Sequence, residues 1–123
     1  MKEVKAFIHN NRIAAVIRAL NDSGYLDSTN PKRVRNVNVG TTQSLLGALG
    51  AHEQHYSVDL GQLVIKEAKL ELLCEDAQAD EIAKVIANAA RTGQDEAGWV
   101  CVNDVKTVLK VSGNSPSASP PRP

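Results

Sequence analysis

The sequence predicts an α+β fold, because a strand, a helix and a strand follow one another twice along the chain. The first set lies within residues 2–39 and the second within residues 64–105. Alternation of apolar and polar residues indicates the strands, and apolar residues three and four apart indicate the helices. This order (βαββαβ) is the split βαβ pattern of ferredoxin-like folds, an antiparallel sheet with two helices on one face.

The first unit begins with residues 2–9, which alternate as a half-buried strand does. A helix follows, which Asn10 or Asn11 is placed to cap and Gly24 to end. Its apolar residues recur at helical spacing: Ile13, Val16, Ile17 and Leu20. Residues 34–39, with three valines, are expected to form the second strand.

The second unit begins with residues 64–74, which alternate again. Asp76 is the expected cap of the helix that follows. The buried stripe of this helix is expected to contain Ile82, Val85, Ile86 and Ala89. Residues 98–105 are then expected to form the fourth main strand.

Two segments are expected to lie outside the regular elements. Residues 40–56 show no steady period, so we expect a long loop there, either functional or a poorly ordered insertion. Within it, residues 45–49 are able to form a short helix when a partner binds. Residues 113–123 are rich in Gly, Ser and Pro, which predicts a flexible tail after a single domain over residues 1–112.

Composition excludes several classes of protein. Lysine plus arginine balance aspartate plus glutamate at 14 each, so no basic field favours nucleic-acid binding. Aromatic residues make up only 3 %, so the core is expected to be aliphatic. Cys74 and Cys101 lack the C-x-x-C spacing of paired zinc ligands. No signal peptide or membrane span is recognised, so we expect a cytoplasmic protein with reduced cysteines.

The sheet face away from the helices is expected to need a cover. Phe7, Leu73 and Trp99 supply apolar side chains to this second face. Exposed apolar surface of this kind favours association with other copies, so oligomerisation is expected.

Four segments, in order along the chain, resemble those of the PII signal-transduction superfamily. Residues 90–93, then four residues, then Gly98 and an apolar strand resemble the nucleotide-binding B-loop of that family. Residues 68–73 match its K-[IV]-E-[IV]-V strand, and residues 37–43 fall where its long T-loop begins. Residues 109–111 resemble its C-loop. The resemblance covers roughly residues 1–113, most of the chain.

The resemblance implies a homotrimer of ferredoxin-like subunits whose sheets face inward. It also implies adenine nucleotides bound in the clefts between subunits. The T-loop, about residues 40–63 here, is expected to change shape with the ligand and to dock onto a membrane transporter or a metabolic enzyme. The implied protein is a signalling protein without enzymatic activity, and nucleic acid is not among its partners.

The expected nucleotide-binding residues come from these matched segments. They are Gly40, Thr41, Thr42, Gln43, Glu71, Leu73, Thr92, Gly93, Gly98, Trp99 and Lys110. Other interpretations stay open for some of them. Thr92 and Gly93 also suit a glycine-capped helix end. Leu73 also suits the core, and Trp99 also suits packing at a subunit interface.

The chain departs from the family at the cations that hold phosphates. Standard members have G-D-G-K where this chain has residues 96–99, so Trp99 replaces a lysine. Thr42 and Ser112 stand at two arginine positions, which leaves Lys110. Each charge-assisted hydrogen bond to a phosphate contributes about 1.5–3 kcal/mol. We therefore expect ADP or AMP to bind in preference to ATP.

Other departures bear on the effectors. Arg33 and Arg35, near the base of the T-loop, are expected to compensate in part for the lost cations. Glu67 stands where the family lysine pairs with 2-oxoglutarate, and its carboxylate would repel that dianion. Divergent relatives are often associated with transporters, including those for bicarbonate. Regulation in carbon metabolism is therefore expected by analogy, with bicarbonate left open as a second ligand.

Two functions of other classes stay open. One is a trimeric metal-binding protein similar to copper-tolerance proteins, with His52 and His55 as ligands. Two histidines alone make a poor site, and a solvated loop is the alternative interpretation. The other is an enzyme on a ferredoxin-like fold, such as an acyl-phosphate hydrolase, although no pair of nucleophile and base is recognised.

Overall fold

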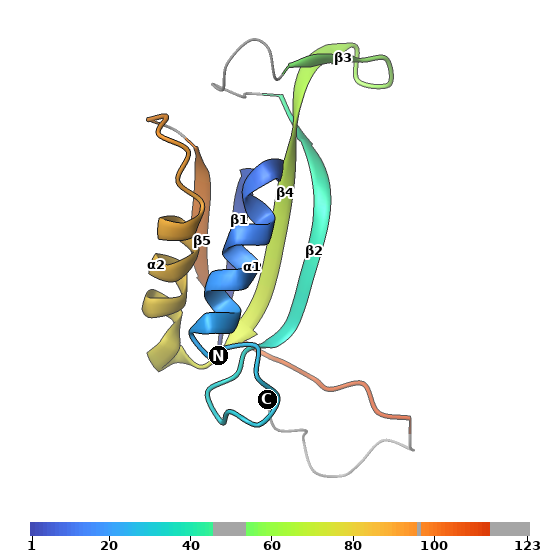
Figure 1. The fold of residues 1–123 in the computed structure, drawn as a ribbon. Helices are drawn as coiled ribbons and strands as arrows, with labels where there is room; N and C mark the ends of the chain where they lie inside the picture. Colours follow the sequence, from blue (N-terminus) through green and yellow to red (C-terminus); the bar gives the residue numbers. More distant parts are fainter. Residues whose placement is uncertain (46–53, 96, 114–123) are drawn as a thin grey trace.

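Two helices pack on one face of an antiparallel sheet (Figure 1). The computed structural model describes residues 1–45, 54–95 and 97–113. The elements, with η for short 3-10 helices, follow in the order β1 (Lys2–His9), η1 (Asn10–Arg12), α1 (Ile13–Asp22), β2 (Arg35–Ser44), β3 (His55–Ser57), β4 (Gln62–Cys74), η3 (Asp76–Gln78), α2 (Ala79–Ala89) and β5 (Gly98–Asp104). In these ranges, no helix is long and apolar enough to cross a membrane.

The sheet has the strand order β2-β4-β1-β5, and β3 pairs with the beginning of β4. β1 runs antiparallel to both of its neighbours, β4 and β5, and β2 runs antiparallel to β4. The first and third main strands therefore lie at the centre of the sheet, and each half of the chain adds one edge strand. The predicted α+β fold, with an antiparallel sheet and two helices, is confirmed, and its strand order is that of ferredoxin-like folds.

The core lies between the sheet and the helices and is aliphatic, as expected from the composition. Alternate residues of β1 and β4 face the helices, because side chains along a strand point to opposite faces. The largest fully buried side chains include Val4, Ile8, Val16, Leu20, Leu70, Leu72, Ile82 and Ile86. Ile82 and Ile86 belong to the predicted stripe of α2, and Val16 and Leu20 to that of α1.

The sheet face opposite the helices, here called the open face, mixes apolar and charged residues. Phe7 lies between Lys69 and Trp99 in the strand register. Lys5 lies between Glu71 and Cys101. The apolar surface that the sequence predicted is therefore only part of the open face, because charged residues of β1 and β4 lie beside the apolar ones.

The prediction of a loop over residues 40–56 is wrong at both ends. β2 continues through Gly40, Thr41, Thr42 and Gln43 to Ser44, and each of these residues pairs with β4. β3 and the beginning of β4 form a hairpin after the gap. These strands carry no clear alternation because most of β2 is exposed on both faces, so only pairing with β4 reveals it. Residues 46–53, with most of the predicted short helix, lie outside the described ranges, as do residues 114–123.

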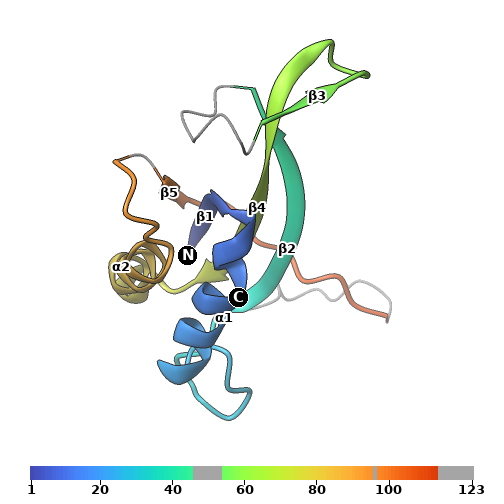
Figure 2. The same ribbon diagram turned by 45° about the horizontal axis from the view of Figure 1, so that its top comes forward.

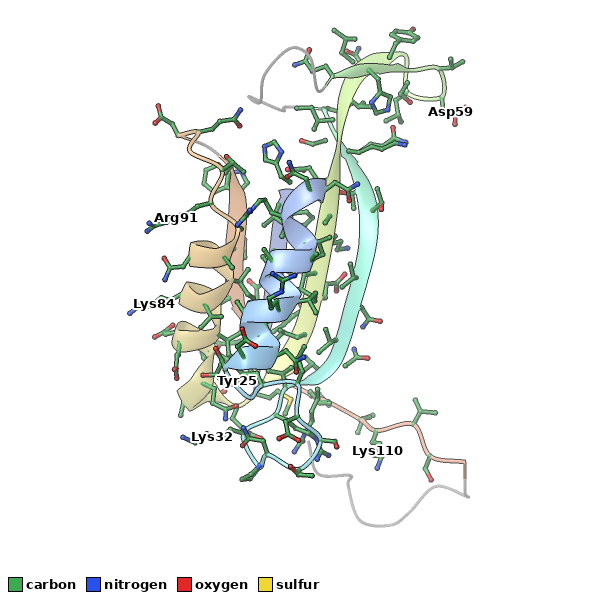
Figure 3. The ribbon with its side chains drawn as sticks, in the orientation of Figure 1. Tyr25, Lys32, Asp59, Lys84, Arg91 and Lys110 are labelled. Carbon is green, nitrogen blue, oxygen red and sulfur yellow. The ribbon has the colours of Figure 1, made fainter. Side chains whose placement is uncertain are left out.

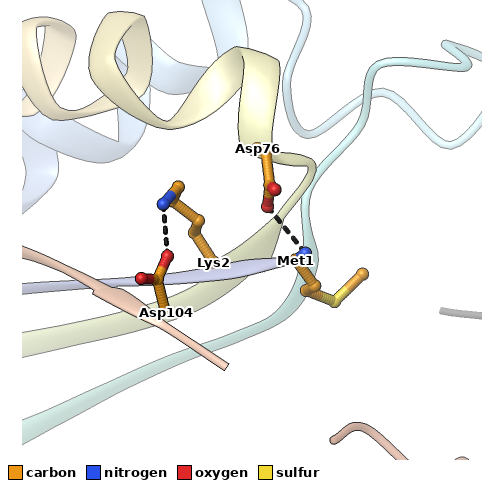
Figure 4. A network of polar contacts seen from close by, with 4 residues as sticks. All are labelled: Met1, Lys2, Asp76 and Asp104. Atoms are coloured by element: carbon orange, nitrogen blue, oxygen red, sulfur yellow. Dashed lines mark hydrogen bonds and ion pairs between the residues drawn. The ribbon is translucent and has the colours of Figure 1, made fainter. Parts of the chain in front are cut away.

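The predicted N-terminal caps are also wrong, whereas Gly24, with φ +83° directly after the C-cap Ser23, ends α1 as predicted. Asn10, Asn11 and Asp76 lie in η1 and η3, which precede the α-helices. Arg12 and Gln78 take the N-cap positions, and neither makes a side-chain cap hydrogen bond. The reason at Asp76 is tertiary, because its carboxylate accepts a 2.6 Å contact from the N-terminal ammonium of Met1 (Figure 4).

Candidate functional site

The loop that joins α2 to β5 borders a pocket of about 500 Å³, here called the loop pocket. Four of the predicted nucleotide-binding residues line it: Thr92, Gly93, Gly98 and Trp99. Trp99 is 64 % exposed and is therefore not a core residue of a single chain. The structure thus brings the B-loop residues together around one concave surface.

Glycine is needed at two positions of the loop pocket, for a different physical reason at each. Gly98 has φ +141°, and a Cβ atom built on it would lie 2.2 Å from the backbone oxygen of Phe7. Only glycine therefore lets β5 approach β1 at this point. Gly93 has φ +88°, but no atom of the described residues lies within 4 Å of its Cβ position. Gly93 is needed for the left-handed backbone alone, and the space beside it is open.

Two residues from the beginning of the chain hold this loop, and sequence analysis missed their role. Arg12 donates from Nε and Nη2 to the backbone oxygen of Ala89, at 3.2 and 2.6 Å. A cation at this place satisfies a carbonyl at the C-terminus of α2 and suits the helix dipole. Nε2 of His9 lies 3.3 Å from Oε1 of Gln94. No local pattern signals either contact, because the partners are far apart in sequence.

A second concave surface, here called the end pocket, has a volume of about 670 Å³. It contains two further predicted residues, Leu73 and Lys110. Arg33 and Arg35 line it as well, which places the expected compensating cations beside Lys110. Its remaining lining residues are Asn36, Val108, Leu109 and Val111. The end pocket therefore combines three cations with aliphatic side chains and holds no carboxylate among its lining residues.

The two pockets lie at opposite ends of the sheet. The strand register puts Gly98 beside Ile8 and Leu73 beside Glu3, so five residue steps along β1, about 17 Å, separate them. Figure 3 shows Arg91 just after α2 and Lys110 well apart from it, on the segment that follows β5. Within one chain, the loop pocket and the end pocket do not form a single site.

The remaining predicted residues lie away from both pockets. Gly40, Thr41, Thr42 and Gln43 are on β2, at the sheet edge opposite to β5. Thr41, Ala68, Ile8 and Gly98 form one row across the sheet, so Thr41 is three strand spacings, about 14 Å, from Gly98.

Glu71 lies on the open face, where Nζ of Lys69 is 2.9 Å from its Oε1. The hydrogen bond from Lys69 is the main cause that lowers the pKa of Glu71 below its ordinary value. Glu71 is therefore an ionised carboxylate that already has a cationic partner. Its expected role in nucleotide binding stays a prediction.

The alternative metal site, with His52 and His55 as ligands, is not supported by a cluster of ligands among the described residues. His55 is on β3, and His52 is outside the described ranges. Among the described residues, no group of three or more His, Cys, Asp or Glu side chains is arranged to hold a metal ion.

The β3–β4 hairpin ends in an exposed apolar segment, here called the hairpin tip (residues 56–63). Figures 1 and 2 show it projecting beyond the helices and the centre of the sheet. The turn is closed by the Gly61 backbone N–H, which donates to the Ser57 oxygen at 2.8 Å, and Gly61 has φ +64°. The exposed large apolar residues of the tip are Tyr56, Val58, Leu60 and Leu63. An exposed group of this kind is typical of a protein–protein contact.

Comparison with known proteins fits these observations. A family model described as "Nitrogen regulatory protein P-II" matches residues 1–115, which include both pockets, β2 and the hairpin tip. A curated relative, "Nitrogen regulatory protein P-II 2" of Methanothermobacter thermautotrophicus, is 27 % identical over 112 residues, which are 90 % of this chain and 89 % of the relative. The match extends over the whole fold rather than one motif, and the chain belongs to the PII family.

Proposed function

We propose that this protein is a regulatory protein that binds an adenine nucleotide, with ADP or AMP favoured over ATP. The observation that carries the proposal is the end pocket, where Arg33, Arg35 and Lys110 lie beside aliphatic side chains. A nucleotide needs both features, because its phosphates are anionic and its base is flat and largely apolar. The loop pocket adds backbone amides around Gly93, a common way to bind phosphate oxygens.

The site is proposed to form between copies of the chain in a homotrimer. The distance between the loop pocket and the end pocket supports this, because one nucleotide does not reach both within a single chain. A neighbouring copy supplies the missing side of each pocket. The apolar residues Phe7 and Trp99 on the open face support association as well.

The preference for ADP or AMP follows from the residues at the family's phosphate-binding positions. Trp99, Thr42 and Ser112 carry no charge where the family has cations. Arg33 and Arg35 of the end pocket are exposed, so solvent and salt weaken their attraction for a third phosphate. A smaller phosphate chain is therefore favoured.

The proposed output is control of a membrane transporter or a metabolic enzyme in the cytoplasm. The segment at residues 40–63 makes this contact, and the apolar hairpin tip supports its role as a docking surface. Carbon metabolism is the proposed setting, with bicarbonate as a second ligand. The protein has no catalytic role in this proposal.

Isothermal titration of the purified protein with AMP, ADP and ATP, each with and without bicarbonate, tests the proposal. Saturable binding of ADP or AMP, tighter than that of ATP, is expected, and a change of affinity with bicarbonate would support the link to carbon metabolism. Gly93→Val is expected to abolish binding, because a β-branched residue does not tolerate the left-handed backbone of the loop pocket.

Gly61→Val is the matched control, since Gly61 also has a positive φ but lies in the hairpin tip. This variant is expected to bind nucleotide as the unchanged protein does. Unaltered affinity in Gly93→Val would refute the role of the loop pocket. Absence of binding by all three nucleotides would refute the proposed function.

A further inference from the structure

β2 contains one extra residue near its beginning, and this residue decides which face of the sheet Arg35 occupies. Arg35 pairs with Leu73 and Asn38 pairs with Glu71, so three steps on β2 match two steps on β4. Within this bulge, Asn36 has φ +54°. Nδ2 of Asn38 donates to the backbone oxygen of Asn36 at 3.0 Å. Asparagine is one of the few residues that adopt such a left-handed conformation readily.

The bulge puts Arg35 on the open face. Residues directly opposite one another in a sheet share a face, so Arg35 shares the face of Leu73, and both line the end pocket. Without the extra residue, Arg35 would lie opposite Cys74, which is buried on the helix side. A shift of one residue inverts the faces of a strand, and bulges commonly redirect side chains beside functional sites.

The cationic side chains of the end pocket have no carboxylate partner among the residues that line it. Nη1 of Arg33 donates to the backbone oxygen of Ser28 at 2.5 Å, which holds this side chain in place. Within residues 1–45, 54–95 and 97–113, neither Arg35 nor Lys110 forms an ion pair. Like charges gathered without a counter-charge repel one another, and an anionic ligand relieves that repulsion.

The aliphatic part of the end pocket narrows the class of anion. Leu109 and Val111 line the end pocket from the segment after β5, on either side of Lys110. Val111 is 95 % exposed in the single chain. Figure 3 shows this segment, with Lys110 labelled, extending away from the sheet. An anion with an apolar portion uses both kinds of lining residue, whereas inorganic phosphate uses only the cations.

We infer that Arg35, assisted by Arg33 and Lys110, recognises the second phosphate of the nucleotide and makes the site select ADP over AMP. The inference rests on the proposed function, because it concerns the same site. It moves phosphate recognition from the B-loop position, where Trp99 stands, to the loop before β2 and the bulge at the beginning of β2. Arginine suits this task because its planar fork donates two parallel hydrogen bonds to phosphate oxygens.

The test compares the affinities of ADP and AMP for the full chain and for three variants, by isothermal titration at one fixed salt concentration. Arg35→Gln is expected to weaken ADP binding by about 10-fold or more and AMP binding much less, so the preference for ADP is lost. Arg35→Lys keeps the charge but not the planar fork of the guanidinium. Its affinity for ADP is expected to lie between those of the unchanged protein and Arg35→Gln. Arg18→Gln, at another exposed arginine on α1, is the control and is expected to change neither affinity.

The outcomes separate the inference from the proposed function. If Arg35→Gln keeps the ratio of ADP to AMP affinity of the unchanged protein, the inference is overturned while the proposed function stands. The same holds if the unchanged protein binds AMP as tightly as ADP. If no nucleotide binds the unchanged protein, both are overturned. Circular dichroism of each variant, with the same unfolding midpoint, excludes a folding defect as the cause.

Discussion

Gly98 is expected at a ligand site, but the fold also needs it, because it lets β5 pack beside β1. Its Cβ position collides with the backbone oxygen of Phe7 at 2.2 Å, and that oxygen belongs to the neighbouring strand rather than to a flexible side chain. Relief of the collision therefore requires a shift of β5 against β1. The glycine is required whether or not a nucleotide binds.

Gly98→Ala is expected to lower the free energy of unfolding by about 2–4 kcal/mol, from strained backbone and a displaced strand. Urea denaturation followed by circular dichroism measures the change. Gly40→Ala is the control, because Gly40 is on β2 and no atom in the described part of the chain lies within 4 Å of its Cβ position. Its stability is expected to be unchanged or slightly higher, since alanine restricts the unfolded chain. Equal stability of the two variants would show that β5 accommodates a Cβ atom.

At the scale of elements, ion pairs at the N-terminus join three parts of the chain (Figure 4). The ammonium group of Met1 contacts Asp76 of η3, and Lys2 of β1 pairs with Asp104 at the end of β5. The backbone N–H of Val105 donates to the oxygen of Met1 at 3.1 Å. The beginning of β1 is thereby tied to the start of the α2 region and to the C-terminal edge strand.

The pair of Met1 and Asp76 predicts a dependence of stability on pH. The hydrogen bond with the ammonium group is the main cause that lowers the pKa of Asp76 below 3.8, and it raises the pKa of the N-terminal amine above 8.0. The Asp76 contribution is therefore present above pH 3.8 and is lost as the pH falls through its folded value. The amine contribution is present below pH 8.0 and is lost as the pH rises through its folded value.

Asp76→Asn is expected to remove both of these losses and so to flatten the curve of stability against pH at its acidic and alkaline ends. Urea unfolding midpoints across that range measure the curve. Asp59→Asn removes a carboxylate in the hairpin tip that forms no ion pair in the described ranges, and is expected to leave the curve unchanged. A curve for Asp76→Asn that coincides with that of Asp59→Asn would mean that the pair contributes nothing in solution.

At the scale of the whole molecule, a substitution on the open face tests whether this face forms the contacts of the proposed homotrimer. Phe7 lies at the centre of this face, between Lys69 and Trp99. Phe7→Asp puts a charge there without touching the helix side, where β1 buries Val4, Ala6 and Ile8. If the open faces meet in a trimer, this charge is expected to convert the assembly to monomers, because burying a charge in an interface is costly even beside Lys69.

Light scattering coupled to size-exclusion chromatography measures the molar mass of each variant. Val58→Asp makes the same kind of change at the hairpin tip, where Val58 is 85 % exposed, and is expected to keep the trimer mass. A monomeric unchanged protein would refute the proposed assembly. A trimer that persists in Phe7→Asp would show that another surface holds the copies together.

The sequence by itself determined the elements that have a strong period. β1, α1, α2 and β4 each bury one face, so apolar residues repeat at the spacing of their own secondary structure. It also indicated the loop around Gly93 and Gly98, because glycines mark backbone that other residues do not adopt. These are local properties, and neighbours in the chain are enough to reveal them.

Only the tertiary structure decided the features that depend on distant partners. β2 reaches Ser44 because β4 pairs with it, and the bulge at Asn36 exists only as a mismatch between these two strands. Asp76 was expected to cap a helix but pairs with Met1, and Arg12 holds a carbonyl at the far end of α2. Residues that the family resemblance assigns to one nucleotide site are also divided between two pockets. The physical reason is the same in each case, because strand register and long-range polar contacts depend on which segments meet in space, and no single segment encodes that.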